Sequence, residues 1–375
     1  MIREAFGIIH AGEAAPNLRE LVTKRALAAL PIAGKYRAVD FPMSNMLNSN
    51  IKNVGVITSR NYRSLMNHLG SGKQWNLSRK NGGLFVLAPF SLIENTGIYR
   101  GTVEALKGSM DYIKRSTEEY AVLVGTDYIY NSSFEDMMRF HVDNEADITV
   151  MYYNANINEP RDDMGEDPFF HIDSDGRIKS IEINPMIPST TARSMKSYII
   201  SKELLINLIN ESFALGDYTF SEGLLRKNLD KYKVMAYEHK GYVGTIRSVE
   251  SYYKVSMDLL DSKIRDELLS SRNRIHTRVK DSVPVKYIGT ATVGNSLIAN
   301  ECIIEGKVEG SIIFRKVRIR KDAVVKNSII FSGADIGGEA ELENVILDKN
   351  VTVKQECKLV GSSAFPIVIR KGGVV

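Results

Sequence analysis

The chain has 375 residues and a mass of 41.9 kDa, and its 49 Lys and Arg against 45 Asp and Glu leave a net charge of +4. Hydrophobic residues make up 43% of the chain and charged residues 25%, a balance that excludes a mainly disordered protein. No run of Lys or Arg exceeds two residues, so the charge pattern gives no indication of nucleic-acid binding. No apolar run approaches the ~18 residues that a membrane-spanning helix needs.

The two cysteines, Cys302 and Cys357, are too few for a disulfide framework or a cysteine-rich zinc site. The N-terminus lacks the apolar core of a signal peptide. We therefore expect a soluble, cytoplasmic protein with reduced thiols and no membrane partner. The length predicts about two domains.

The first 270 residues alternate strand-like and helix-like segments. Short apolar runs predict buried parallel strands at 5–10, 54–58 and 120–124. Helical spacing of apolar residues predicts helices at 101–115, at 133–145 with Ser132 or Ser133 as its N-cap, and at 249–269. Residues 173–177 predict a hairpin turn. This alternation predicts an α/β domain over residues 1–270, with a mixed, mostly parallel sheet.

Beyond residue 285 aliphatic residues recur six apart. Four groups keep this spacing: Ile298 and Ile304; Ile313, Ile319 and Val325; Ile330, Ile336 and Leu342; Val353 and Leu359. Such hexapeptide repeats predict a left-handed parallel β-helix over 287–375, in which aliphatic residues stack from coil to coil. We expect 306–310 to be a loop between coils and 271–286 to be a linker. An antiparallel sandwich is the alternative.

Five blocks, in the same order along the chain, resemble one known family. They are GKYRAVDFPMSN at 34–45, SRKNGG at 78–83, YRGTVEA at 99–105, GTDYIY at 125–130 and VGT at 243–245. Together with the hexapeptide repeats they resemble the ADP-glucose pyrophosphorylase (glucose-1-phosphate adenylyltransferase) family over nearly the whole chain. The resemblance implies a Rossmann-like nucleotidyltransferase domain. It also implies a reaction that joins ATP and glucose 1-phosphate into ADP-glucose and pyrophosphate, usually with magnesium.

The loop after the first strand departs from the family's glycine-rich GGxGxRL pattern. Gly12 is its one remaining glycine, Glu13 adds negative charge, and Pro16 has no amide to donate. Asn17 stands where the resemblance places an arginine. These changes predict poor binding of a triphosphate.

Three other positions have lost the charge that the resemblance implies. Leu27 and Asn184 replace lysines, and Tyr242 replaces an aspartate that would share a metal ion with Asp127. Glu182, one position before the family's glutamate, is a possible substitute for it. A single carboxylate holds magnesium poorly, so Asp127 is a weak metal ligand or, alternatively, a cap for the turn that follows it.

The chain therefore resembles the non-catalytic, GlgD-type partner subunits of this family. We expect no required cofactor, with Mg²⁺ bound only by a catalytic partner or at a weak residual site. The alternative is an active adenylyltransferase with an atypical phosphate loop. A residual nucleotide or sugar-phosphate pocket is expected to include Gly12, Tyr99, Gly101, Thr102, Asp127, Glu182 and Gly244.

Cationic residues are candidates for a site that binds a phosphorylated effector, a ligand class that the resemblance implies. The candidates are Lys24, Arg25, Lys35, Arg37, Arg79 and Lys80. Four of them have a plainer alternative: a charged helix face for Lys24 and Arg25, or solvation or pairing with Asp40 for Lys35 and Arg37. The dense cationic segment 315–321 is either an effector or partner contact or a solvated face.

The sequence also bears on two further classes of function. Hexapeptide acyltransferases commonly use a histidine in the β-helix as a base, and no histidine follows His276, which argues against that activity. A stand-alone sugar-phosphate sensor is not distinguished from a regulatory subunit. Because a β-helix ends in open coils and the family usually forms tetramers, we expect self-association and heterotetramers with a catalytic subunit.

Overall fold

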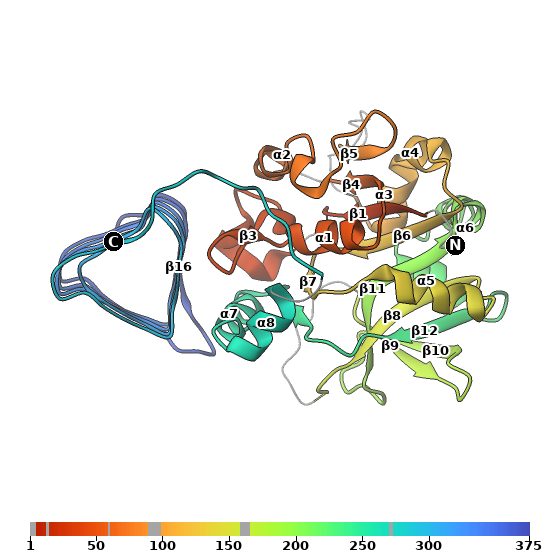
Figure 1. The fold of residues 1–375 in the computed structure, drawn as a ribbon. Helices are drawn as coiled ribbons and strands as arrows, with labels where there is room; N and C mark the ends of the chain where they lie inside the picture. The colour runs from red at the N-terminus through yellow and green to blue at the C-terminus, as the bar shows by residue number, and fades with distance from the viewer. Residues whose placement is uncertain (1–4, 13–14, 59–60, 89–98, 158–165, 270–272) are drawn as a thin grey trace.

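A computed structural model describes residues 5–12, 15–58, 61–88, 99–157, 166–269 and 273–375. An α/β part built on one large sheet lies beside a triangular β-helix that contains the C-terminus (Figure 1). The mixed, mostly parallel sheet and the parallel β-helix are both confirmed.

The large sheet joins nine strands among the described residues. Its parallel part runs in the order β6, β1, β4, β5, and β11 pairs antiparallel with both β6 and β8, so the sheet is mixed. β9 and β10 form the antiparallel hairpin that the turn at 173–177 predicts. The strands are β1 Ala5–His10, β4 Asn53–Ile57, β5 Gly83–Leu87, β6 Tyr120–Gly125, β8 Ile148–Asn154, β9 Pro168–Ile172, β10 Ile178–Ile183, β11 Ala192–Ser201 and β12 Val234–Glu238.

Helices cover both faces of this sheet. Successive strand residues point to opposite faces, so Ile8 joins the core with α3, α4 and α6, while Ile9 joins the core with α1, α2 and α5. The helices are α1 Asp40–Asn48, α2 Arg63–Leu69, α3 Thr102–Gly108, α4 Met110–Arg115, α5 Phe134–Asp143, α6 Lys202–Ala214, α7 Val249–Asp258 and α8 Ser262–Leu269.

Two of the predicted helices are each divided in two. The helix expected at 101–115 breaks at Ser109, and the one expected at 249–269 breaks after Asp258. The N-cap of α5 is Ser133, whose hydroxyl accepts the Glu135 N–H. Short segments complete this part: η1 Pro16–Val22, η2 Leu27–Ala29, η3 Lys73–Trp75, η4 Phe220–Leu225, η5 Arg226–Asn228, β2 Pro31–Ile32, β3 Tyr36–Arg37, β7 Tyr128–Ile129 and β13 Gly244–Thr245.

The β-helix consists of three parallel five-stranded sheets. The first holds β14 Lys286–Tyr287, β17 Ile303–Ile304, β20 Arg318–Ile319, β23 Asp335–Ile336 and β26 Thr352–Val353. The second holds β15 Thr292–Gly294, β18 Lys307–Glu309, β21 Val324–Lys326, β24 Glu341–Glu343 and β27 Lys358–Val360. The third holds β16 Leu297–Ile298, β19 Ile312–Ile313, β22 Ile329–Ile330, β25 Val345–Leu347 and β28 Ile367–Ile369.

The six-residue spacing places successive aliphatic residues on successive sheets of one coil. Ile313, Ile319 and Val325 thus belong to β19, β20 and β21, and Val325 stacks on Leu342 of the next coil. The expected loop at 306–310 is wrong, because β18 occupies it and the buried Val308 pairs in register with Val325. Glycines at both ends of this strand are typical of a loop, so the sequence did not indicate a regular coil here.

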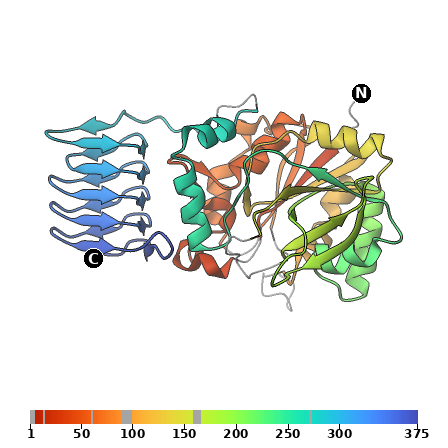
Figure 2. The same ribbon diagram turned by 90° about the horizontal axis from the view of Figure 1, so that it is seen from below.

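The third sheet of the β-helix packs against the α/β part (Figure 2). Phe314 and Phe331 lie in one buried cluster with Leu18 of η1 and Tyr252 of α7. The Phe331 ring makes edge contacts with Phe314 at 5.2 Å and with Tyr252 at 6.3 Å between ring centres. This apolar interface fixes how the two parts sit, so residues on either side of it can build one pocket.

Among the described residues, no helix has the length and apolar character required to cross a membrane.

Candidate functional site

A first pocket lies at the carboxyl ends of β1 and β6, the edge where open α/β sheets bind ligands. Its volume is about 190 Å³, small for the usual range of ligand pockets, which begins at roughly 300 Å³. Its lining includes five residues of the predicted pocket, Gly12, Tyr99, Gly101, Thr102 and Asp127, and also the degenerate position Leu27.

The loop that should hold a triphosphate turns into a helix instead. Pro16 begins η1, and the Leu18 N–H donates to the Ala15 carbonyl at 3.1 Å, so that amide is used within the chain. Asn17 does not line the pocket, Glu13 lies outside the described residues, and the buried side chain of Leu27 forms an apolar wall. An apolar wall gives a phosphate no counter-charge.

Gly101 is required by a close backbone approach. A Cβ at this position would lie 2.2 Å from the carbonyl oxygen of Tyr218, which itself accepts the Val103 N–H at 2.9 Å. The glycine therefore holds the start of α3 against the Tyr218 segment and places Thr102 on the pocket wall.

Asp127 is buried and ion-paired through one of its two carboxylate oxygens. Its Oδ2 accepts from Arg247 Nε at 2.8 Å and from Lys196 Nζ at 3.3 Å. The Asp127 carbonyl also accepts the Ile246 N–H at 2.9 Å, because β13 pairs with β7 directly after Asp127. The pairing of β13 with β7 therefore brings Arg247, which follows β13 closely, against the carboxylate.

A buried ionic network extends from this pair. Arg247 also donates to Asp167 Oδ1 at 3.3 Å and to the Tyr128 hydroxyl at 2.8 Å, and Arg193 Nε donates to the same Asp167 oxygen at 2.6 Å. Sequence reasoning missed Lys196, Arg247, Asp167 and Arg193. The one signal it had was the arginine two residues after Gly-Thr at 244–245.

The other predicted positions lie off the pocket. Glu182, expected as a substitute carboxylate, instead pairs with His171 at 2.7 Å and accepts from Ser189 on the partly exposed side of the hairpin. Asn184 Oδ1 accepts the Asp167 N–H at 2.6 Å, so Asn184 stabilises the backbone position of an acid in the ionic network.

Tyr242 and Gly244 also lie outside the pocket lining. The Tyr242 hydroxyl donates to Asp258 at 2.8 Å at the end of α7. Gly244 pairs with Ile129, where a Cβ would lie 2.7 Å from the side chain of Val255. Gly244 is therefore required for packing between β13 and α7.

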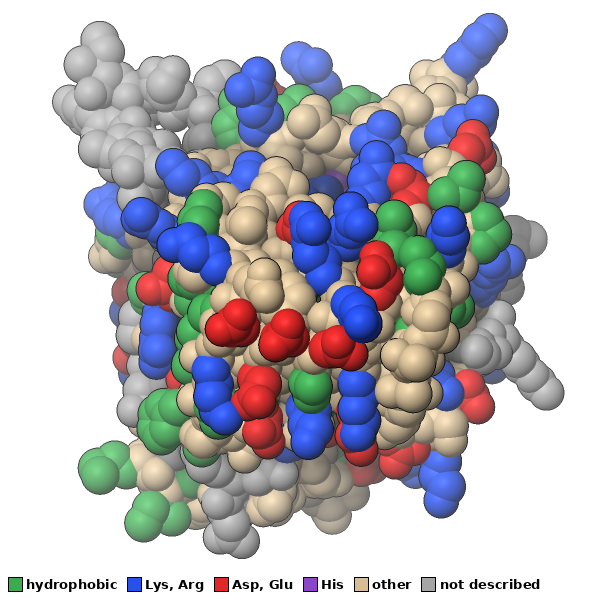
Figure 3. Space-filling view, turned by 90° about the vertical axis from the view of Figure 1, so that its left-hand side faces the viewer, with side chains coloured by type: hydrophobic (Ala, Val, Ile, Leu, Met, Phe, Trp, Pro, Cys, Tyr) green, Lys and Arg blue, Asp and Glu red, His purple; other side chains and the backbone are tan. Residues whose placement is uncertain are grey.

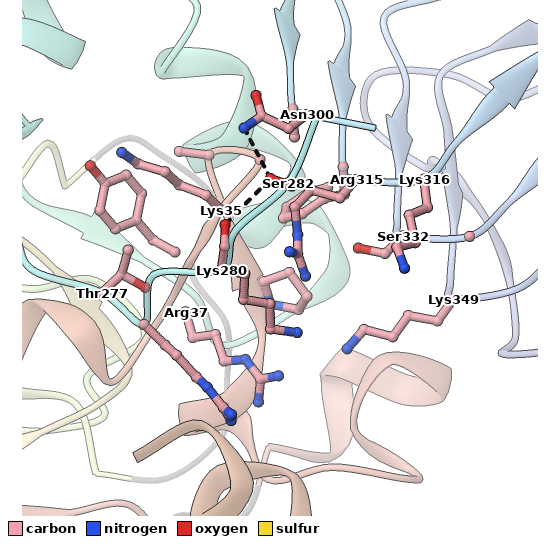
Figure 4. A pocket seen from close by; sticks show the side chains of 18 of the residues that line it. Lys35, Arg37, Thr277, Lys280, Ser282, Asn300, Arg315, Lys316, Ser332 and Lys349 are labelled. Atoms are coloured by element: carbon pink, nitrogen blue, oxygen red, sulfur yellow. Dashed lines mark hydrogen bonds between the residues drawn. The ribbon is translucent and has the colours of Figure 1, made fainter. Parts of the chain in front are cut away.

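A second and larger pocket, of about 560 Å³, lies between the α/β part, the segment 277–282 and the β-helix (Figure 4). Its lining holds seven cationic side chains, and none of the described residues that line it is Asp or Glu. The seven are Lys35, Arg37, Arg278, Lys280, Arg315, Lys316 and Lys349. Figure 4 shows Arg37, Lys280 and Lys349 directed into the same space.

Burial and repulsion from neighbouring cations lower the pKa values of Arg37, Lys280 and Lys349. Burial, with the charges of Arg37 and Arg25 next, lowers the pKa of Lys349 to about 8. Burial lowers the pKa of Arg37 to about 10, and burial with the charge of Arg315 lowers the pKa of Lys280. An anion bound among these groups would oppose both causes, since it supplies the missing counter-charge.

The two predicted effector residues in this pocket, Lys35 and Arg37, approach it from β3 and the turn before it. The Arg37 side chain is not paired with Asp40, which was the plainer alternative for this residue. Asp40 accepts the backbone N–H of Arg37 at 2.9 Å and pairs with His68 at 2.5 Å, whereas the Arg37 guanidinium donates to Ser64.

The other predicted effector residues are not gathered here. Arg25 is buried and joins Asp348 across the interface between the two parts at 2.5 Å, so it is a structural ion pair rather than an open anion site. Arg79 donates to the Asn76 carbonyl on the surface, and Lys24 and Lys80 are exposed away from the pocket.

The cationic segment 315–321 is divided between two surroundings. Arg315 and Lys316 line the large pocket and also lie within 3.9 Å and 3.2 Å of Glu301, which does not line it. Arg318 pairs with Glu305 and Arg320 with Asp335, and neither arginine lines the pocket. On the β-helix side of the molecule, cationic and acidic side chains are interspersed (Figure 3). That face therefore has no large region of one charge.

Comparison with known families agrees with this architecture. A family model described as nucleotidyl transferase matches residues 6–262, and a model described as GlmU-like, C-terminal hexapeptide matches residues 286–364. The chain therefore belongs to the nucleotidyl transferase family over residues 6–262 and carries a hexapeptide-repeat domain after it.

Relatives of similar length narrow the class. A "Glycogen biosynthesis protein GlgD" of Bacillus subtilis is 33% identical over 98% of this chain and 96% of the relative's length. A "Glucose-1-phosphate adenylyltransferase" of Clostridium perfringens is 30% identical over 100% of this chain and 96% of the relative's length. Another "Glucose-1-phosphate adenylyltransferase", of Mycoplasma mobile, is 31% identical over 87% of this chain and 85% of the relative's length. The chain belongs to the glucose-1-phosphate adenylyltransferase (ADP-glucose pyrophosphorylase) family.

Proposed function

We propose that this chain is a regulatory, non-catalytic subunit in glycogen biosynthesis that associates with a catalytic glucose-1-phosphate adenylyltransferase. One observation carries the proposal: the cations that line the pocket at the carboxyl ends of β1 and β6 are paired with acids of the chain itself, Arg100 with Glu104 and both Lys196 and Arg247 with Asp127. Leu27 forms an apolar wall there, and Asp127 is already neutralised by Arg247 and Lys196. Transfer between two polyanions depends on positioned cations and metal ions, which this pocket does not offer to a substrate.

The names of the relatives support the same biological setting. The relative in Bacillus subtilis is named for glycogen biosynthesis without an activity, and the other two are named for adenylyl transfer. The competing function is an active adenylyltransferase with an atypical phosphate loop.

The test is ADP-glucose synthesis by the purified chain, alone and titrated into a catalytic glucose-1-phosphate adenylyltransferase from the same organism. We expect no synthesis by the chain alone, and a changed rate or effector response in the mixture that saturates with added chain. Turnover by the chain alone at roughly 10 per second, an ordinary enzyme rate, contradicts the proposal and supports the active enzyme.

We further propose that the large cationic pocket binds a phosphorylated effector. Seven cations converge there, and the described residues of its lining include no acid, so a ligand with two phosphate groups would relieve their repulsion. Binding of a sugar bisphosphate, measured by calorimetry, should weaken at least tenfold in Arg315→Gln. Arg318→Gln is the matched control, because Arg318 lies on the same coil and pairs with Glu305 outside the pocket. Equal losses in both variants contradict the assignment.

Self-association is proposed from the first coil of the β-helix. β14 and β15 pair on one side only, with β17 and β18, and they expose the side chains of Tyr287 and Val293. An open coil with exposed apolar side chains is an edge that proteins commonly cover with a partner. Light scattering should give a mass of several chains, and Tyr287→Lys/Val293→Lys should lower it. A monomeric wild type contradicts this proposal.

A further inference from the structure

Asp127 lies where a family member would hold a metal ligand, yet two cations of the chain itself already contact it. Lys196 Nζ and Arg247 Nε both donate to Oδ2, at 3.3 Å and 2.8 Å. The Asp127 side chain is 2% exposed, the Arg247 side chain 5% and the Lys196 side chain 16%. These pairs are therefore largely shielded from water, where ionic contacts are screened least.

Lys196 occupies an unusual backbone position. Its φ is +49°, in the left-handed region, and it lies at a bulge in β11 where the register with β8 shifts between Ser194 and Ser197. A side chain costs free energy in this conformation, and such strain gathers at functional positions. The bulge directs the Lys196 ammonium toward Asp127 rather than along the alternation of the strand.

Arg247 is fixed by three separate acceptors. Its guanidinium bridges Asp127 and Asp167 and donates to the Tyr128 hydroxyl. One guanidinium thus spans the two buried carboxylates, each of which also contacts a second cation, Lys196 at Asp127 and Arg193 at Asp167. Hydrogen bonds between charged groups are stronger than neutral ones, so this bridge is strongly held.

The residues present do not fit a divalent cation. No group of three His, Cys, Asp or Glu among the described residues is placed to hold a metal. Glu166, the other acid in the pocket lining, uses both carboxylate oxygens to accept N–H groups of Ser221 and Glu222. Asp127 Oδ1 is buried without a hydrogen-bond partner among the described residues, and it is the one carboxylate oxygen of these two acids that the chain leaves open. A hard divalent ion requires several oxygen ligands, and a single oxygen does not supply them.

We propose that Lys196 and Arg247 together replace a divalent cation at Asp127. Their combined charge of +2 (1 + 1) equals that of the ion they displace, and the bridge holds Asp127 and Asp167 in one arrangement. This inference goes beyond the regulatory role, because it concerns cation binding by the isolated chain. Its test therefore gives an answer that does not depend on whether the chain modulates a partner.

The experiment is a titration of the full chain with Mn²⁺, followed by the electron paramagnetic resonance signal of the free ion. We expect the wild type to bind no equivalent tightly at this site. Lys196→Gly removes one cation and also relieves the left-handed backbone, so it should fold and bind one equivalent with at least tenfold lower Kd. Arg247→Gln, which retains hydrogen-bond donors, is the second variant.

The controls separate this site from adventitious ones. Adding Asp127→Asn to Lys196→Gly should return Mn²⁺ binding to the wild-type level. Glu356→Gly relieves the same backbone conformation (φ +59°) on an exposed coil of the β-helix, and it should leave Mn²⁺ binding unchanged. The inference is overturned if the wild type binds an Asp127-dependent equivalent as tightly as the variants, or if neither variant binds better than the wild type.

Discussion

The cationic pocket between the two parts of the molecule predicts opposite effects of one substitution on stability and on ligand binding. Lys349→Met keeps the aliphatic stem of the side chain and removes its charge. We expect the free energy of unfolding at pH 7 to rise and the affinity for a sugar bisphosphate to fall. Functional sites often carry such a cost to stability.

The magnitude follows from the pKa of Lys349. Burial and neighbouring cations lower this pKa from 10.5 to about 8, which corresponds to about 3 kcal/mol against the charged form in the folded state. Solvent screening of this partly exposed group leaves a measurable gain of roughly 1–2 kcal/mol in the variant.

The pH dependence has a fixed sign. Between pH 8 and 10.5 the unfolded chain binds more protons at Lys349 than the folded chain, so the stability of the wild type rises with pH across this window. Below about pH 8 the lysine is charged in both states and the penalty is constant. The advantage of Lys349→Met should therefore be largest below pH 8 and disappear near pH 10.5.

The assay is urea unfolding of the wild type and the variant at pH 7 and pH 10, with and without a sugar bisphosphate. Lys321→Met is the matched control, because the side chain of Lys321 is 79% exposed on the β-helix and lies outside the pocket. Loss of stability in Lys349→Met at pH 7, or equal stabilisation of wild type and variant by the bisphosphate, would refute the reasoning.

Three further predictions concern other parts of the molecule. Arg25→Met should lower the free energy of unfolding by roughly 3–5 kcal/mol in a denaturant titration, because it leaves Asp348 buried without its ion pair; a loss under 1 kcal/mol would contradict this. Gly101→Ala should lower the melting temperature by several degrees, because a Cβ there would lie 2.2 Å from the backbone oxygen of Tyr218. An unchanged melting temperature would show that the Tyr218 segment moves to make room for the methyl group. Cys302 is buried and burial raises the pKa of its thiol, so a thiol reagent should modify it more slowly than Cys357 in the native protein and equally fast in urea; equal native rates would contradict the burial.

Much of the fold could be predicted from local sequence patterns. The apolar run at 120–124 and the six-residue spacing after 285 depend on period alone, and both correspond to the observed β6 and β-helix. The predictions of secondary structure were wrong where the sequence pattern is ambiguous. A helical period continues through the break after Asp258, and glycines around β18 suggested a loop.

The candidate site was predicted where residues stand close to a strand end or, as with Tyr99, Gly101 and Thr102, just before or at the start of α3. Gly12 and Asp127 follow β1 and β6 directly, so the carboxyl edge of the sheet brings them into one pocket. Glu182 also follows the expected motif, yet its strand directs it to His171. A shift of one residue along a strand moves a side chain to the opposite face.

The sequence alone determined the two-part architecture, the family and the loss of charge at Leu27. These depend on residue types and spacing, which a linear chain already contains. Only the tertiary structure decided that Lys196 and Arg247 meet at Asp127, and that cations from four separate segments surround one pocket. The physical reason is that such contacts depend on which strands pair, on a bulge with left-handed backbone, and on an apolar interface that fixes the β-helix against α7 and η1.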